Sequence, residues 1–384
     1  MFILDQPYVS EELKEYITAK KAPVLKNGTA LEILDQENCH FVSEDQFTQL
    51  FSDGKRIYTC SENSLDWVIQ NIEDDSLKSN IERLKNKALF RDLLAPGYPD
   101  FFYQRASLEE LSSLNADTFS YPFILKPQVG FFSVGVYPIT NESDWELAVA
   151  DLGSKVADWK QLFPESVLNT EFILEQYIYG EEVAIDAYYD DKGEAVILNI
   201  LKHDFDGMGD VSDRFYYTGK AVIETYLEPL SQWLTEVNRI LGIKNFPFHA
   251  EVRIDNGQFT PIEFNPLRFA GWCCTDISYF AFGFYTYDYY LNNKRPDWNT
   301  LLDGKDGKYY TLIVMDRTGE IDDDVGFDYI SACNQLGTVL CLRKINYHEK
   351  TIYGFLFTEI AQDDKVTMQR IMERDFQQFL IDVI

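Results

Sequence analysis

The chain has 384 residues, 46% of them hydrophobic, so it is long enough to bury more than one core. Lysine and arginine number 34 against 63 aspartate and glutamate residues, giving a formal net charge of -29. This balance argues against nucleic acid and against an anionic membrane as partners. A phosphate-bearing ligand would need local lysines or bound metal ions in so acidic a protein.

The first residues, MFILDQPYVSEELKEY, lack the basic start and the long apolar core of a signal peptide. No run approaches the roughly 18 apolar residues of a transmembrane helix. The six cysteines show no C-x-x-C spacing of the metal-binding type. We interpret them, including the adjacent Cys273–Cys274 pair, as reduced thiols that serve packing in a cytoplasmic protein.

Residues 1–84 predict a small α/β domain, because strand-like and helix-like runs alternate there. The strands are MFILDQ, PVLKN and RIYTC, and the helices are SEELKEYITAK and SENSLDWVIQNI, the second capped by Ser61 or Ser64. The segment contains no G-x-G-x-x-G, so it gives no support for a dinucleotide site. The run LKSNIERLKNKALFRDLLA then predicts one helix ended by Pro96–Gly97.

Strands dominate from Pro122 onward and predict an α+β region with helices between strand clusters. The strands are YPFILK, TEFILEQYI, EVAIDAYYD, AVILNILKHD, FPFHAEVRID and QFTPIEFNP, and the helices are ESDWELAVADLG and EPLSQWLTEVNRILG. Residues 305–384 predict a small C-terminal domain: YYTLIVMD, GTVLCLRKI and YGFLFTEI as strands, and DKVTMQRIMERDFQQFLIDVI as a terminal helix.

The most informative segment is FHAEVRIDNGQFTPIEFNP, which predicts a hairpin with one polar face. In its first strand His249 and Glu251 alternate with apolar residues, and in its second Glu263 and Asn265 do the same. Whether the two polar faces coincide depends on the turn, because a slip of one residue moves every side chain to the other face.

A two-residue loop at Asn256–Gly257 would direct the Glu251 and Glu263 carboxylates to opposite sides of the sheet. A three-residue loop, in which Ile254 pairs with Gln258, keeps them on one side and also aligns the apolar residues of both strands. We therefore predict the three-residue loop.

In this register His249 faces Glu263, and Glu251 lies diagonal to it on the same face as Asn265. Two carboxylates and a carboxamide are hard oxygen ligands suited to Mg²⁺ (or Mn²⁺), and a solvated hairpin face is the alternative. His249 fits either a base or a structural hydrogen bond.

Three segments follow one another in an order that resembles the ATP-grasp superfamily, specifically its carboxylate–amine ligases: FILKPQVGFFSVGV, EQYIYGEEVAID and AEVRIDNGQFTPIEFNPLRFAG. The resemblance covers roughly residues 85–300. It implies a mixed α/β and α+β chain with an ATP-grasp domain at residues 85–304. An N-terminal α/β (pre-ATP-grasp) domain precedes it, and a small C-terminal α+β domain follows.

The resemblance makes Lys126 and Lys87 ligands of the ATP phosphates, although a helical lysine such as Lys87 is often only solvated. It also makes Gln128–Gly135 the loop that covers the phosphates. This loop departs from the family pattern because Phe131 and Phe132 stand among few glycines, so a hydrophobic lid is the alternative.

For the nucleoside, the resemblance assigns Glu175 to the adenine amino group and the backbone of Gln176, Tyr177 and Ile178 to the edge of the ring. Glu182 would bind the ribose hydroxyls. Exposed acids without a ligand are the alternative in so acidic a chain.

Three cations are candidates for catalytic roles. Arg268 would face an acyl phosphate or a substrate carboxylate. In the commonest family form the arginine directly follows the Asn–Pro pair, whereas here Leu267 is inserted between that pair and Arg268. Lys202 is placed near the γ-phosphate, or else carries an amphipathic stem along an apolar strand face. Arg214 is a second arginine candidate on a loop.

We therefore predict an ATP-dependent, ADP-forming ligase that activates a small carboxylic acid and joins it to an amine, with an amino acid or small peptide as acceptor. A kinase acting on a hydroxyl and a nucleotide-binding module without catalysis are the alternatives. We expect neither nucleic acid nor membrane as a partner, and homo-oligomers are compatible with the sequence.

Overall fold

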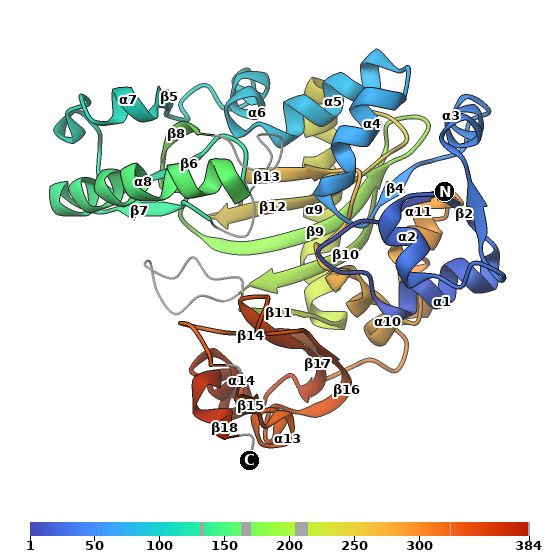
Figure 1. Ribbon diagram of the computed structural model, residues 1–384. Coiled ribbons are helices and arrows are strands. Elements are labelled where there is room, and N and C mark those ends of the chain that lie inside the picture. The colour runs from blue at the N-terminus through green and yellow to red at the C-terminus, as the bar shows by residue number, and fades with distance from the viewer. Residues whose placement is uncertain (131–133, 163–169, 204–213, 323, 383–384) are drawn as a thin grey trace.

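The computed structural model describes residues 1–384 except 131–133, 163–169, 204–213, 323 and 383–384 (Figure 1). The N-terminal segment forms a parallel sheet in the order β3-β2-β1-β4, as its α/β pattern predicts. Side chains of Ser10, Asn27 and Ser43 cap its first three helices. The elements are β1 (Phe2–Ile3), α1 (Glu11–Lys20), β2 (Pro23–Leu25), α2 (Gly28–Ile33), β3 (His40–Val42), α3 (Glu44–Ser52), β4 (Tyr58–Thr59) and α4 (Leu65–Asn71).

The single helix predicted after this sheet is wrong, because the chain forms two helices there, α5 (Asp75–Lys85) and α6 (Lys87–Leu94). Asn86 lies between them with extended backbone, and its side-chain oxygen accepts hydrogen bonds from the N–H groups of Ala88 and Leu89 at 3.0 Å. An asparagine is a poor helix former and a good N-cap, so it starts a second helix where the hydrophobic pattern predicts continuation.

A second sheet of four strands, in the order β5-β8-β6-β7, has its own small core. Its residues lie on the left of Figure 1, where the long helix α8 runs beside it. The elements are β5 (Tyr103–Ser107), α7 (Leu108–Leu111), β6 (Phe123–Pro127), β7 (Tyr137–Ile139), α8 (Glu142–Leu162) and β8 (Glu171–Gln176).

The largest sheet has eight strands in the order β13-β12-β9-β10-β11-β14-β17-β16, with antiparallel neighbours throughout. Strands from the segment after residue 305 continue this sheet, because β11 pairs with β14. The strands are β9 (Glu181–Tyr189), β10 (Ala195–His203), β11 (Phe215–Thr218), β12 (Phe246–Asp255), β13 (Gln258–Pro266), β14 (Lys308–Asp316), β16 (Thr338–Lys344) and β17 (Ile352–Ala361).

Helices connect and cover the large sheet. The predicted helix at EPLSQWLTEVNRILG begins earlier than expected, since α9 (Lys220–Leu241) starts before Pro229 and includes it. The other helices of this part are α10 (Ile277–Phe282), α11 (Thr286–Leu291) and α12 (Trp298–Leu301).

The predicted long terminal helix is wrong beyond its first half. The helix α14 (Lys365–Met372) ends early, and the following chain forms β18 (Leu380–Asp382), which pairs with β15 (Val325–Phe327) beside α13 (Tyr329–Cys333). Asp375, whose side chain caps the short 3-10 helix that begins at Phe376, marks the end of the helical pattern.

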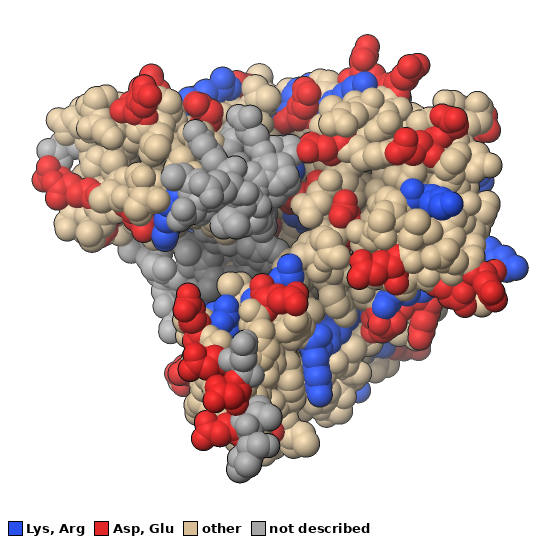
Figure 2. Space-filling view, in the orientation of Figure 1, with Lys and Arg blue, Asp and Glu red and all other residues tan. Residues whose placement is uncertain are grey.

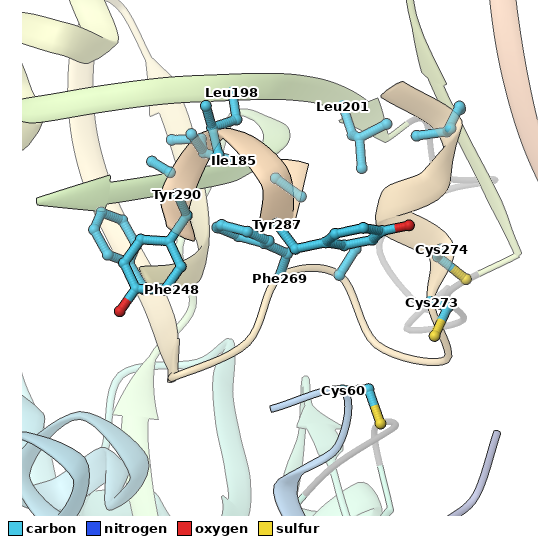
Figure 3. Packing of buried hydrophobic residues seen from close by; sticks show 14 of the residues in the cluster. Cys60, Ile185, Leu198, Leu201, Phe248, Phe269, Cys273, Cys274, Tyr287 and Tyr290 are labelled. Carbon is cyan, nitrogen blue, oxygen red and sulfur yellow. The ribbon is translucent and has the colours of Figure 1, made fainter. Parts of the chain in front are cut away.

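The N-terminal and large sheets share one continuous core, and aromatic rings join them. Tyr287 packs against Phe2 and Tyr58 of the N-terminal sheet at ring-centroid distances of 5.9 and 5.7 Å. Figure 3 shows Cys60 of the N-terminal domain beneath the loop that carries Cys273 and Cys274. All six cysteines are free, and the adjacent Cys273 and Cys274 are buried in the core, where burial raises the pKa of Cys273 to about 12.

Acidic side chains are scattered over every lobe of the face seen in Figure 2, with basic ones among them. This distribution agrees with the net charge of -29. Within the described ranges, no helix is both long and apolar enough to cross a membrane.

Candidate active site

The turn of the β12–β13 hairpin differs from the prediction. Asp255 pairs with Gln258, so the loop has only two residues, Asn256 and Gly257. Both have positive φ, 48° and 79°, as a type I′ turn requires. The predicted three-residue loop is therefore wrong.

A β-bulge nevertheless brings the two carboxylates to the same face. The pairing shifts by one residue at Ile262, and beyond it Glu251 lies directly opposite Glu263. The common polar face was thus predicted for the wrong reason, since the extra residue sits in the strand and not in the turn. The predicted pairing of His249 with Glu263 is also wrong, because His249 lies opposite Asn265.

Glu263 is the centre of this polar face. Its Oε1 accepts a hydrogen bond from Asn265 Nδ2 at 2.9 Å, and its Oε2 lies 2.7 Å from Lys87 Nζ. Burial favours the protonated acid, but Lys87 and Asn265 outweigh it and hold the pKa of Glu263 at about 2. Glu251 Oε1 lies 3.8 Å from His249 Nε2 on the same face.

His249 is fixed from behind by Asp186. His249 Nδ1 lies 2.7 Å from Asp186 Oδ1, and this fully buried carboxylate also accepts hydrogen bonds from Ala270 N and Thr275 Oγ1. Of the two roles considered for His249, this arrangement favours the structural hydrogen bond.

Lys87 reaches the hairpin because a helix begins at this residue. Asn86 caps α6, and the Lys87 N–H donates to Gln128 O at 2.8 Å, which anchors the helix start against the end of β6. Burial disfavours the ammonium, but the carboxylate of Glu263 outweighs burial and raises the pKa of Lys87. The break in the predicted helix is therefore what places this lysine at the site.

Glu175 lies between two cations in a group that we call the Glu175 triad: Glu175, Arg91 and Lys126. Lys126 Nζ contacts Glu175 Oε1, and Arg91 Nε lies 2.9 Å from Glu175 Oε2. Burial would raise the pKa of Glu175, yet the two cations hold it at about 2. Arg91 also donates to the carbonyl oxygens of Pro261 and Ile262, so it joins the triad to the bulge of β13.

The segment between β8 and β9 passes close to β12. Gly180 has φ 107°, and a Cβ there would lie 2.3 Å from Ile254 O, so only glycine fits this approach. Before it, Gln176 Oε1 accepts a hydrogen bond from Phe102 N at 2.8 Å.

Arg253 organises the residues expected to meet the nucleoside. Its guanidinium lies over the Tyr177 ring at 5.2 Å and donates to Ile178 O at 2.7 Å. Its Nε lies 3.0 Å from Glu182 Oε2, and His203 Nδ1 is 3.5 Å from the other oxygen of that carboxylate. The structure thus brings Tyr177, Ile178 and Glu182 together around one arginine.

Arg268 lies beside a carboxylate from the N-terminal domain, and together they form what we call the Glu62 triad: Glu62, Lys85 and Arg268. Arg268 Nη2 and Nε lie 2.5 and 3.2 Å from Glu62 Oε1, and Lys85 Nζ lies 3.3 Å from Oε2. The inserted Leu267 has φ 57°, and its carbonyl accepts from the N–H of Thr59 in β4. That contact fixes Arg268 next to the end of the N-terminal sheet.

The charged groups of the Glu62 triad interact electrostatically with the carboxylates of the hairpin. Burial and the carboxylate of Glu263 favour the protonated form of Glu62, whereas Arg268 and Lys85 outweigh them and lower its pKa. Burial disfavours the charged form of Arg268, but Glu62, Glu263 and Glu251 together raise its pKa. The triad and the hairpin face therefore form one electrostatic unit.

The other two candidate cations lie elsewhere. Lys202 Nζ is 3.2 Å from Glu181 Oε2, on the strand pair β9–β10. Arg214 pairs with Asp316 at 3.1 Å, and its carbonyl accepts from Val314 N in β14, so it contacts the C-terminal segment. The predicted loop Gln128–Gly135 lies partly outside the described residues.

The hairpin face fits a divalent cation that is only partly held by protein. Within the described part of the chain, no group of three or more His, Cys, Asp or Glu side chains is suited to holding a metal ion. Two carboxylates and an amide are enough for Mg²⁺, because this ion keeps several waters and binds substrate phosphates. In this structure the cation beside Glu263 is the Lys87 ammonium, 2.7 Å from Oε2.

Sequence reasoning missed Arg91, Glu62, Lys85, Asp186 and Arg253. One signal was available for Arg91, which follows Lys87 by one helical turn and so lies on the same face of α6. Glu62 and Arg268 are 206 positions apart in sequence, and no local pattern joins them.

Known proteins share the fold of this chain. Residues 119–276 match the family described as the ATP-grasp domain. Among curated proteins, none shows a significant sequence match.

Solved structures match almost the whole chain. The L-amino acid ligase from Bacillus licheniformis has a TM-score of 0.67 at 17% identity, covering 99% of this chain and 97% of that chain. The N5-carboxyaminoimidazole ribonucleotide synthetase from Thermotoga maritima has a TM-score of 0.60 at 15% identity, covering 99% and 98%.

The biotin carboxylase domain of the Hydrogenobacter thermophilus 2-oxoglutarate carboxylase, solved as a dimer with MgADP and bicarbonate, has a TM-score of 0.58 at 12% identity, covering 100% and 96%. At these identities the likeness establishes a common fold, and the predicted fold class is confirmed.

Proposed function

We propose that this chain, in which residues 119–276 match the ATP-grasp domain, is an ADP-forming ligase that activates a carboxylic acid and joins it to an amine. The observation that carries the proposal is the combination on one hairpin face of two carboxylates, an amide and the Lys87 ammonium, next to the Arg268 guanidinium. Such a face can bind a nucleotide triphosphate through cations and hold a substrate carboxylate beside it.

In the proposed reaction, a carboxylate oxygen of the acid attacks the γ-phosphorus of ATP. The bond between that phosphorus and the β–γ bridging oxygen breaks, and ADP leaves with the bonding electrons. The nitrogen lone pair of the amine then attacks the acyl carbon, the carbon–oxygen bond to phosphate breaks, and inorganic phosphate leaves. The nitrogen loses a proton to solvent, which leaves an amide.

The residues of the site divide this work. Lys87 and Lys126 would neutralise the phosphates, and Arg268 would bind the carboxylate of the acid. Glu251, Glu263 and Asn265 would hold Mg²⁺ (or Mn²⁺), which supplies positive charge to the transferring phosphoryl oxygens.

Adenosine would bind along the β8–β9 segment, with the backbone of Gln176–Ile178 at the ring edge and Glu182 at the ribose. An adenine amino group would have to compete with Arg91 and Lys126 for Glu175, so we assign to Glu175 the positioning of Lys126. Lys202 and Arg214 remain candidates that would first have to leave their ion pairs.

We further propose small-molecule substrates, with an amino acid or a small peptide as the amine. The similarity to the L-amino acid ligase from Bacillus licheniformis supports this choice. The six free thiols support our proposal of a cytoplasmic location.

The test is incubation of the purified chain with ATP, MgCl₂ and pooled amino acids, followed by assays of ADP and mass spectrometry of the products. We expect ADP release that depends on both an acid and an amine, with a matching amide. A stable phosphorylated hydroxyl compound without an amide would instead identify a kinase. ATP binding without any turnover would identify a nucleotide-binding module.

A further inference from the structure

The Glu62 triad joins two parts of the chain at the proposed site. Glu62 follows β4, at the carboxyl end of the N-terminal parallel sheet, and Arg268 follows the β12–β13 hairpin. Ligands commonly bind at the carboxyl ends of parallel strands, so Glu62 occupies the position from which this domain can contact a substrate.

The two charged groups are enclosed but remain accessible. Glu62 keeps 10% and Arg268 11% of its side chain exposed, so both side chains are still in contact with solvent. Their contact is end-on, because both Arg268 Nη2 and Arg268 Nε approach the same oxygen, Oε1. It lacks the paired geometry of a two-oxygen arginine–carboxylate bridge.

The second oxygen of Glu62 is less fully engaged. Lys85 Nζ lies 3.3 Å from Oε2, but this ammonium is buried without a hydrogen-bond partner among the described residues. Oε2 therefore retains the capacity to accept a hydrogen bond from another donor.

A guanidinium and a carboxylate in contact offer complementary charges to the two ends of a zwitterion. On the proposed function, Arg268 binds the carboxylate that ATP phosphorylates. When the carboxylate of a ligand binds Arg268, this arginine turns away from Glu62. Glu62 then lies next to the part of the ligand that is one or two bonds from that carboxylate. An ammonium group placed there replaces the charge that Arg268 withdraws.

Resting on the proposed function, we propose that Glu62 binds the α-ammonium group of the acid substrate, so that the activated acid is an α-amino acid. The ammonium stays protonated on Glu62 and so cannot act as the attacking amine. The enzyme then distinguishes the acid substrate from the attacking amine, because Glu62 binds the amino group of the acid substrate only. An acid without the amino group would leave Glu62 enclosed with less positive charge around it, and would be used poorly.

The experiment compares a panel of L-α-amino acids with the same acids lacking the amino group, for example L-alanine with propionate. Glycinamide serves as the amine because it has no carboxylate to activate. ADP release with MgATP gives kcat and KM for each acid. We expect the wild-type protein to prefer the amino acids on the order of 10- to 100-fold in kcat/KM.

Glu62→Gln keeps the shape of the side chain and removes its charge. We expect it to reduce kcat/KM for the amino acids on the order of 10- to 100-fold, mainly through KM, and not to reduce it for the acids without an amino group, because it removes the uncompensated charge that makes them poor substrates. Glu62→Asp should restore part of the preference. Glu12→Gln is the matched control, because Glu12 lies 2.8 Å from a buried arginine, Arg343, outside the site. It should change neither class of acid.

Two results would overturn the inference while leaving the ligase proposal intact. One is an equal loss for both classes of acid in Glu62→Gln. The other is a rise in KM for glycinamide alone, which would place the attacking amine on Glu62.

If no acid and amine release ADP, the ligase proposal fails and the inference is tested by binding. Calorimetry with a non-hydrolysable ATP analogue and MgCl₂ should then show L-α-amino acids binding to the wild-type protein and binding at least 10-fold more weakly to Glu62→Gln. Equal binding by both proteins would overturn it.

Discussion

The Glu175 triad and the Glu62 triad have the same composition, one glutamate between a lysine and an arginine, but they differ in enclosure. Glu175, Arg91 and Lys126 keep only 2%, 4% and 6% of their side chains exposed, about a fifth to a half of the corresponding values in the Glu62 triad, 10%, 11% and 12%. Arg91 also donates hydrogen bonds to the carbonyls of Pro261 and Ile262. The carboxylate of Glu175 is thus saturated by donors of the protein itself, whereas the carboxylate of Glu62 can accept a donor from a ligand.

The largest expected effect tests the saturated side of this comparison. Glu175→Gln leaves Arg91 and Lys126 buried without their carboxylate, and should lower the free energy of unfolding by about 3–5 kcal/mol. Urea unfolding measures the loss. Glu62→Gln is the matched change in the more exposed triad and should cost only about 1 kcal/mol, because the amide oxygen of the new side chain can still accept a hydrogen bond from Arg268. Equal losses in the two variants would remove the distinction between the triads.

The next effect concerns turnover at the hairpin face that the two triads flank. Glu263→Gln keeps the hydrogen bond with Asn265 possible but removes the charge that faces Lys87. We expect kcat to fall about 100-fold or more. Because Lys87 loses its carboxylate, the free energy of unfolding should also fall, by about 1–3 kcal/mol. Steady-state ADP release gives the rate, and unchanged circular dichroism serves as the control for folding. Retained turnover would remove Glu263 from the cation site.

Acid titration sharpens the comparison without altering the proposed ligands. The folded pKa of Glu175 is about 2, below its ordinary value of 4.5, so its contribution to stability is fully present above about pH 4.5 and is lost as the pH falls toward 2. The loss should amount to about 3 kcal/mol. Urea unfolding between pH 6 and pH 3 should therefore show a steeper decline for the wild-type protein than for Glu175→Gln. Parallel declines would contradict this.

The smallest effect separates the turn from the bulge. Gly257→Ala puts a side chain at φ 79°, where nothing lies within 4 Å of the new Cβ, so the cost is conformational and about 1 kcal/mol. We expect kcat to be unchanged, because the bulge at Ile262 and not the turn brings Glu251 opposite Glu263. A large fall in kcat would show that the turn also controls the alignment of the carboxylates.

The sequence was sufficient to predict most helices and strands and the polar residues of the hairpin. It was not sufficient to predict which side chains contact one another. The common face of Glu251 and Glu263 followed from apolar patterning, which limits the register to shifts of two residues. Patterning cannot say where an extra residue lies, so the bulge was assigned to the turn. At Asn86 the hydrophobic period continues from one helix into the next. The boundary between the two helices is set by the Asn86 cap and not by this period.

Long-range ion pairs were beyond local patterns altogether. Glu62 meets Arg268 only because β4 lies against the chain that leaves the hairpin, where Leu267 O accepts from Thr59 N. Similarly, the order of the large sheet, in which β11 pairs with β14, depends on packing between segments far apart in the sequence.

The bulge at Ile262 has a consequence for building on this protein. Arg91 holds the carbonyls of Pro261 and Ile262, so the alignment of Glu251 with Glu263 is anchored from outside the hairpin. The exposed tip at Asn256–Gly257 is therefore not needed to align the two carboxylates. Such a tip can receive an epitope tag or a fluorescent reporter as an insertion, close to the proposed site and yet without displacing its carboxylates.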